Sequence, residues 1–190
     1  MNLPNKLTLS RIAAIPIFMV FAFPMPFFDN TTLIFRFLAV FVYVIASITD
    51  SLDGYIARKR NIVTNFGKFL DPIADKLLVT AALFALIPRN PTMYLWATML
   101  IISREFIVTG MRLVAANGGV VIAAGKLGKL KMIAQTIAII ILLISPLFTG
   151  IIEKVIIIAG DSFLAIAVIL TIVSGVEYVA KNIELLKKDM

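Results

Sequence analysis

Long apolar runs alternate with short polar breaks along the whole chain. Each run is close to the roughly 20 residues that an α-helix needs to cross the hydrocarbon core of a bilayer, and the breaks are rich in Pro, Gly, Asn and Asp, which favour turns. The pattern predicts six transmembrane helices, at residues 8–28, 32–52, 68–88, 92–115, 130–149 and 154–179. Residues 1–10 are predicted to form a short N-terminal interfacial segment, and the polar residues 58–65 to join the second and third helices.

The composition agrees with this pattern. Of the 190 residues, 61% are apolar and 15% are charged, whereas soluble domains average about 45–50% and about 25%. We therefore expect an all-α integral membrane protein in which residues 1–190 form a single membrane domain. The first apolar run has no cleavage site of small residues followed by a polar chain, so it is predicted to be a retained helix and not a signal peptide.

The predicted loops differ strongly in their basic residues, and the net charge of +7 comes from this bias. One side of the predicted membrane domain holds only Arg36, Arg89 and Lys154. The other side collects Lys6, Arg11, Arg58, Lys59, Arg60, Lys68, Arg112, Lys126, Lys129, Lys131, Lys181, Lys187 and Lys188. Because loops rich in Lys and Arg stay in the cytoplasm, we expect both termini inside a bacterial-type cytoplasmic membrane.

Cysteine and histidine are both absent from the sequence. This excludes disulfides, a thiol nucleophile and a phosphohistidine intermediate, and it removes the most common general base. Any proton transfer must then use Asp, Glu, Lys or Tyr.

Aspartates gather at predicted helix ends on the basic side of the membrane. Asp50 and Asp53 are one helical turn apart, and so are Asp71 and Asp75 on the next helix. These two helices are consecutive and joined by a short segment, so we expect them to be antiparallel neighbours that bring the four carboxylates together. Ionisable groups at membrane depth usually serve a function; the alternative is a set of interfacial charges solvated at helix ends.

The carboxylates cannot share a partly dehydrated site unless protons or cations neutralise them. Ligation by oxygen alone suits Mg²⁺, Mn²⁺ or Ca²⁺, and Mg²⁺ is commonly held by a few carboxylates together with substrate phosphates. Small residues at 54, 57 and 67 lie on the same helical faces and leave room for a bulky ligand, although they would equally allow close helix packing.

Residues 50–75 also carry a fixed motif, which reads Asp50-x2-Asp53-Gly54-x2-Ala57-Arg58-x8-Gly67-x3-Asp71-x3-Asp75. At every defined position it resembles the motif of the CDP-alcohol phosphotransferase family. The resemblance implies a reaction in which an alcohol attacks a CDP-linked lipid and CMP leaves.

The family resemblance also implies roles for individual residues. It assigns two divalent cations, Mg or Mn, to Asp50, Asp53, Asp71 and Asp75, and the role of general base to Asp75 as well. It further implies a homodimer. The CDP-lipid site would involve Gly54, Ala57, Arg58, Thr64, Gly67, Asn5 and Thr8. Arg58 could instead be a cytoplasmic anchor together with Lys59 and Arg60.

Basic residues in the second half predict where the acceptor binds. Arg104 and Arg112 lie nearly in line on the fourth predicted helix, and Lys129 and Lys131 open the fifth. If they converge on the aspartates, they form a basic pocket suited to an acceptor that itself carries phosphate. A buried Arg104 needs a partner, and Glu105 is expected to be a poor one because it points about 100° away on the same helix.

The pattern of these basic residues, Ser103-Arg104-Glu105-Phe106, Arg112 and Gly128-Lys129-x-Lys131-x3-Gln135, resembles the phosphatidylglycerophosphate synthases of the family. The implied substrates are CDP-diacylglycerol and sn-glycerol 3-phosphate. Met132 stands where those enzymes often have Thr, and a phosphatidylinositol-phosphate synthase remains the alternative. An ion-coupled transporter would also use intramembrane aspartates, but it would spread them across the bilayer. Nucleic acid is not an expected partner, because membrane topology accounts for the positive charge.

Overall fold

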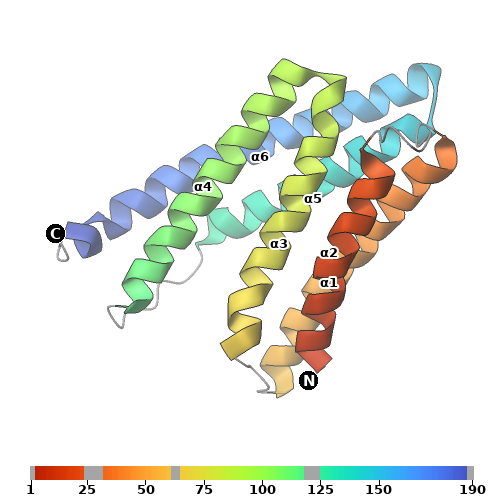
Figure 1. The fold of residues 1–190 in the computed structure, drawn as a ribbon. Helices are drawn as coiled ribbons and strands as arrows, with labels where there is room; N and C mark the ends of the chain where they lie inside the picture. The colour runs from red at the N-terminus through yellow and green to blue at the C-terminus, as the bar shows by residue number, and fades with distance from the viewer. Residues whose placement is uncertain (1–2, 24–31, 61–64, 118–124, 188–190) are drawn as a thin grey trace.

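The computed structural model of the chain describes residues 3–23, 32–60, 65–117 and 125–187, and it describes the backbone alone for 3–7, 50–60, 65–69, 71–72, 116–117 and 183–187. In this part the chain forms six α-helices and two short 3-10 helices (Figure 1). The helices are α1 (Leu3–Ala22), α2 (Leu33–Arg60), α3 (Asn65–Leu86), η1 (Ile87–Arg89), α4 (Pro91–Asn117), α5 (Lys126–Ile144), η2 (Ser145–Leu147) and α6 (Gly150–Lys187).

The prediction of six helices is confirmed, and several of the helices extend beyond the predicted membrane spans. Residues 3–10 belong to the same continuous helix as the first apolar run, so there is no separate N-terminal segment in this region. The polar segment 58–65 is shorter than predicted, because α2 continues through Arg60 and α3 already begins at Asn65. Charged residues are compatible with a helix once it leaves the apolar region, so a change in polarity does not mark the end of a helix.

Pro88 and Pro146, near the ends of the third and fifth predicted helices, fall in η1 and η2. Proline has no backbone N–H and disrupts a regular α-helix, so the chain tightens into a 3-10 turn at each of these points. Gly150 then has a φ of +69°, a left-handed conformation that glycine adopts without a steric penalty, and α6 starts there.

The helices run alternately up and down, so the first residues of α1, α3 and α5 lie at the same end as the last residues of α2, α4 and α6 (Figure 1). Helix α1 packs against both α2 and α3, which also contact each other, and α5 packs along α6. One apolar core connects all six helices; its most buried members include Phe18, Tyr43, Ala82, Ile101, Leu142 and Leu164.

Two helical stretches are long and apolar enough to cross a membrane, at Lys126–Leu147 and Gly150–Asn182. Only 22% of the most apolar window of the second stretch is buried inside the protein. Large side chains such as Ile151, Ile158 and Val176 are exposed along α6. Apolar surface of this extent is unfavourable in water, so these faces fit a lipid environment. Shorter apolar helices cover Thr8–Ala22 and Leu33–Thr49.

We call the end of the bundle that contains η1, η2 and the start of α6 the closed end. Here Arg36 Nη1 donates a hydrogen bond to the carbonyl oxygen of Pro146 at 3.2 Å, and Arg89 Nη1 donates to Ser145 Oγ. The hydroxyl group of Tyr94 donates a hydrogen bond to Asp161 Oδ1 at 2.8 Å. These bonds connect helices that are far apart in the sequence, so the polar groups at the closed end hold the bundle together.

Candidate active site

The four motif aspartates all lie in helical segments. Asp50 and Asp53 are one turn apart in the second half of α2, and Asp71 and Asp75 are one turn apart in the first half of α3. Asp75 is the one member of the quartet with a described side chain; the side chains of Asp50, Asp53 and Asp71 lie outside the described residues. The backbone is therefore consistent with the predicted pairs, and the predicted metal ligation stays a prediction.

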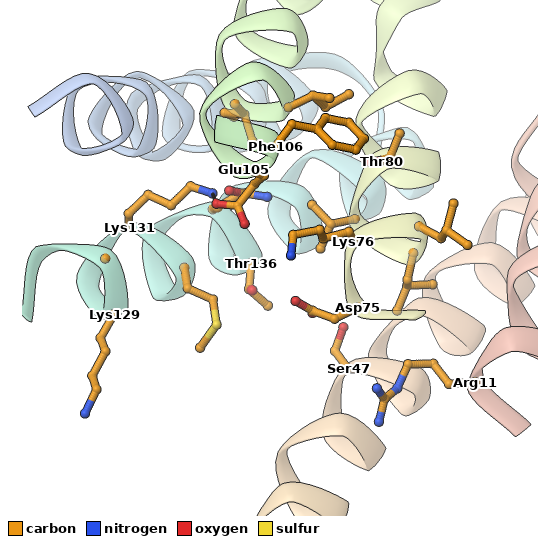
Figure 2. A pocket seen from close by; sticks show the side chains of 18 of the residues that line it. Arg11, Ser47, Asp75, Lys76, Thr80, Glu105, Phe106, Lys129, Lys131 and Thr136 are labelled. Carbon is orange, nitrogen blue, oxygen red and sulfur yellow. Dashed lines mark hydrogen bonds and ion pairs between the residues drawn. The ribbon is translucent and has the colours of Figure 1, made fainter. Parts of the chain in front are cut away.

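Asp75 lines a cavity of about 550 Å³. The walls come from α1, α2, α3, α4 and α5, so the end of the bundle opposite η1 and η2 is hollow, and we call it the cavity end. Figure 2 shows the carboxylate of Asp75 beside the hydroxyl-bearing side chains of Ser47 and Thr136. Lys76 extends into the space between Asp75 and Glu105 (Figure 2). Its charge interacts electrostatically with the carboxylate of Glu105. The cavity thus brings a carboxylate from α3 together with polar groups of the two helices that carry the predicted acceptor residues.

Lys131 and Glu105 form the most buried ion pair at the cavity end within the described residues. Lys131 Nζ donates to Glu105 Oε1 at 2.8 Å, and the lysine is only 4% exposed. A buried ammonium group is costly without a partner, and Glu105 provides one while both side chains line the cavity. The pair faces the carboxylate of Asp75, whose charge also acts on Lys131.

Arg104 turns toward α6 and is not among the residues that line the cavity. Its guanidinium donates to Ser174 Oγ at 3.1 Å and to Glu105 Oε1 at 3.0 Å. The expectation that Glu105 would be a poor partner was wrong, because the two long side chains bend toward each other in spite of their angular separation. Gly175 leaves room for Arg104: an added Cβ there would lie 3.1 Å from Arg104 Cγ.

The other two predicted acceptor residues do line the cavity. Arg112 Nε donates to the Tyr178 hydroxyl at 3.3 Å, and the guanidinium carbon lies 5.5 Å from the centre of the tyrosine ring. Stacking of this kind holds a guanidinium in place while leaving other N–H groups for a ligand. Lys129 extends away from the Glu105–Lys131 pair (Figure 2). Arg112, Lys129 and Lys131 thus line the same cavity as Asp75, and their predicted binding of the acceptor phosphate stays a prediction.

The predicted CDP-lipid residues are described only in part. Thr8 is buried, at 1% exposure, in α1. Gly54, Ala57, Arg58 and Gly67 lie in helical segments whose side chains are outside the described residues, as is the side chain of Asn5. Thr64 lies wholly outside the described residues. The predicted contacts of this group with the nucleotide stay predictions.

A second hollow of about 240 Å³ lies between α1 and α2, with walls that are mostly apolar, including Ile17, Phe41 and Ile45. Arg11 lines both this groove and the larger cavity, although its side chain is only 1% exposed. The groove and the cavity are therefore adjacent, which places an apolar hollow beside one whose wall carries charged side chains.

Sequence reasoning missed Arg11 and Glu105 as cavity residues. Each is a charged residue inside an apolar run, a signal that could have marked both as functional. Arg11 was read as one of the basic residues of the cytoplasmic side, and Glu105 only as a poor partner for Arg104. Tyr43 and Ser47, which also line the cavity, carry no comparable signal because such residues are common in membrane helices.

Known proteins resemble this chain over most of its length. The family model for CDP-alcohol phosphatidyltransferase matches residues 1–173. This chain belongs to the CDP-alcohol phosphatidyltransferase family. The resemblance inferred from the aspartate motif is thereby confirmed, and the cavity beside Asp75 is the candidate active site of a family member.

Several relatives of this CDP-alcohol phosphatidyltransferase carry more specific names. A CDP-diacylglycerol–glycerol-3-phosphate 3-phosphatidyltransferase of Bacillus subtilis is 50% identical over 193 residues, which covers 98% of this chain and 97% of the relative. A protein of the same name from Rickettsia bellii is 42% identical over 93% of each chain. A probable phosphatidylglycerophosphate synthase of Mycobacterium tuberculosis is 37% identical, covering 95% of this chain and 81% of the relative.

Proposed function

We propose that this protein transfers the phosphatidyl group of CDP-diacylglycerol to sn-glycerol 3-phosphate, giving phosphatidylglycerophosphate and CMP. The observation that carries the proposal is the cavity that Asp75 lines together with Lys131 and Arg112. A carboxylate can take a proton from an alcohol, and nearby cations can hold a phosphate. The 50% identity to a relative with this named activity, over 98% of the chain, supports the same acceptor.

The two hollows suit the two parts of a lipid nucleotide. The apolar groove between α1 and α2 fits an acyl chain, and the polar cavity that shares Arg11 with it fits the charged head group. A soluble substrate such as glycerol 3-phosphate would need only the polar part. The substrate pair therefore accounts for an apolar hollow that opens beside a charged one.

The proposed reaction breaks the phosphoanhydride bond of the CDP diphosphate and forms a new phosphoester bond. The primary hydroxyl oxygen of glycerol 3-phosphate attacks the phosphorus atom that carries diacylglycerol. Asp75 accepts the hydroxyl proton, the bond from that phosphorus to the CMP oxygen breaks, and CMP leaves. Arg112, Lys129 and Lys131 hold the phosphate of the acceptor so that its hydroxyl faces Asp75. The contribution of the protein is then mainly orientation and charge stabilisation, as in other phosphoryl transfers.

We further propose that Asp50, Asp53, Asp71 and Asp75 hold two divalent cations, Mg²⁺ or Mn²⁺. Two observations support the fit: the helical backbone puts each pair one turn apart, and carboxylate oxygens are the donors that these cations prefer. When bound, the cations would polarise the diphosphate and stabilise the leaving CMP. In this proposal the remaining predicted nucleotide contacts come from Gly54, Ala57, Arg58, Thr64, Gly67, Asn5 and Thr8.

We also propose an orientation of the protein in the membrane and an oligomeric state. Six transmembrane helices in a bacterial-type cytoplasmic membrane, with the cavity end facing the cytoplasm, would agree with the basic residues at that end and with cytoplasmic supply of glycerol 3-phosphate. A homodimer is proposed from the family resemblance.

Release of CMP by the purified protein tests the proposal directly. The protein in detergent is incubated with CDP-diacylglycerol and Mg²⁺, and the acceptors compared are glycerol 3-phosphate, inositol phosphate, inositol, serine and none. We expect CMP release only with glycerol 3-phosphate, and its loss on chelation of the metal. Release only with inositol phosphate would favour the alternative synthase. Ion transport without CMP release with any acceptor would overturn the enzymatic proposal.

A further inference from the structure

Gln135 on α5 has a buried amide that the mechanism above does not use. The side chain is only 4% exposed, and its oxygen Oε1 has no hydrogen-bond partner among the residues that the structure describes. Leaving a buried carbonyl oxygen unpaired costs on the order of 1–3 kcal/mol. Such a group usually has a reason to be retained, and a ligand that completes its hydrogen bonds is one.

The position of Gln135 suggests which ligand this is. Gln135 lines the same cavity as Asp75 and lies one helical turn beyond Lys131, on the same face of α5. Its neighbour along the chain, Thr136, lies beside Asp75 (Figure 2). The amide therefore lies in the wall of the cavity that also holds Asp75, one helical turn from the group proposed to hold the acceptor phosphate.

Glycerol 3-phosphate has one functional group between its phosphate and its primary hydroxyl, namely the secondary hydroxyl at C2. With the phosphate at Lys131 and Arg112 and the primary hydroxyl at Asp75, this secondary hydroxyl lies in the middle of the cavity. A hydroxyl both donates and accepts hydrogen bonds, so it can satisfy a glutamine amide in either orientation of its oxygen and nitrogen. Neither lysine nor arginine could accept a proton from it.

We propose that the side-chain amide of Gln135 forms a hydrogen bond with the secondary hydroxyl of the acceptor and thereby makes the enzyme specific for a glycerol phosphate. This inference rests on the proposed function, because it takes glycerol 3-phosphate as the acceptor. A site built to hydrogen-bond a substrate hydroxyl discriminates strongly against an analogue without it, since the protein group is then left buried and unpaired.

The test compares two acceptors in the purified protein with CDP-diacylglycerol and Mg²⁺. 3-Hydroxypropyl phosphate keeps the phosphate and the primary hydroxyl of glycerol 3-phosphate but lacks the secondary hydroxyl. We expect the wild-type kcat/KM for CMP release to be about 10- to 100-fold higher with glycerol 3-phosphate. In Gln135→Met, which keeps the length of the side chain but not the amide, we expect this ratio to fall to within about threefold of unity, mainly through slower use of glycerol 3-phosphate.

Thr98 provides a matched control. It is 0% exposed, its Oγ1 is also without a hydrogen-bond partner among the described residues, and it does not line the cavity. Thr98→Val should leave the acceptor ratio at its wild-type value, which separates recognition of the hydroxyl from a general effect of removing a buried polar group.

Two results would overturn this inference while leaving the proposed function intact. One is a wild-type enzyme that uses both acceptors equally well. The other is a Gln135→Met enzyme that keeps the wild-type ratio or loses activity equally with both acceptors, which would assign Gln135 a structural role. By contrast, a wild-type protein that releases no CMP with glycerol 3-phosphate would contradict the proposed function itself.

Discussion

At the closed end of the bundle, Arg36 and Arg89 donate hydrogen bonds to Pro146 and Ser145, and Tyr94 pairs with Asp161. At the cavity end, Arg112 and Lys131 are also held by partners, but both line a hollow that contains Asp75. Both ends therefore contain intramembrane or interfacial charges with good partners. Charge alone does not distinguish a functional site; what distinguishes the cavity end is the open space that its charged groups face.

The largest difference between the two ends should appear when a carboxylate is removed from each. Asp75→Asn cannot accept the acceptor proton, so we expect turnover to fall by about 10²- to 10⁴-fold, with CDP-lipid binding largely intact. CMP release and equilibrium binding of CDP-diacylglycerol measure the two effects. Asp161→Asn at the closed end is the control and should keep turnover within a few-fold of wild type. Wild-type turnover in Asp75→Asn would remove Asp75 as the base.

Removing an arginine from each end gives a smaller effect on substrate use. Arg112→Ala loses a charged hydrogen-bond donor for the acceptor phosphate, so the KM for glycerol 3-phosphate should rise by about 10- to 100-fold, and more than the KM for CDP-diacylglycerol. Steady-state kinetics with each substrate varied in turn measures both constants. Arg36→Ala at the closed end should leave both KM values near wild type. An equal rise of both constants in Arg112→Ala would argue against an acceptor site there.

Packing toward the closed end predicts a change in stability. Helices α5 and α6 approach closely at Gly160, where an added Cβ would lie 2.6 Å from Leu142 Cγ. Gly160→Ala should therefore destabilise the protein by about 1–3 kcal/mol, seen as a lower Tm in detergent. Gly110→Ala on α4 is the matched control, because an added Cβ there meets nothing within 4 Å. If Gly110→Ala lowers the Tm as much as Gly160→Ala does, close packing at Gly160 is not the cause.

The smallest expected effect concerns one hydrogen bond at the closed end. Tyr94→Phe removes the donor to Asp161 Oδ1 and should cost about 1 kcal/mol of stability. The thermal midpoint in detergent and the rate of CMP release should be measured on the same preparation. We expect a small drop in Tm with unchanged turnover; a large loss of turnover would mean that the two ends are functionally coupled.

The number of helices could be predicted from the apolar runs, and two of the helix ends from Pro88 and Pro146; both agree with the described residues. The ends of helices could not be predicted as well. Helix α2 continues through the charged residues up to Arg60, and α1 starts at Leu3, before the apolar run. Hydropathy reports where a helix is buried in apolar surroundings, whereas hydrogen bonding along the backbone decides where it ends.

Some features of the candidate site could likewise be predicted from the sequence, and others could not. That Arg112, Lys129 and Lys131 lie at the same end of the bundle as Asp75 could be predicted, because the topology of alternating helices places them there, and all four line one cavity; their role in binding the acceptor stays a prediction. The direction of Arg104 was not predicted. It depends on space beside Gly175 and on Ser174, both of which belong to a helix about 70 residues away in the sequence.

The sequence by itself determined the family, the helical membrane architecture and the spacing of the aspartates, since these follow from local periodicity and from a motif within 26 consecutive residues, 50–75. Only the tertiary structure decided that Glu105 neutralises Lys131, that Arg11 joins an apolar groove to the polar cavity, and that the amide of Gln135 is buried at its wall. These features depend on which side chains from different helices reach the same space, and no periodicity within one helix contains that information.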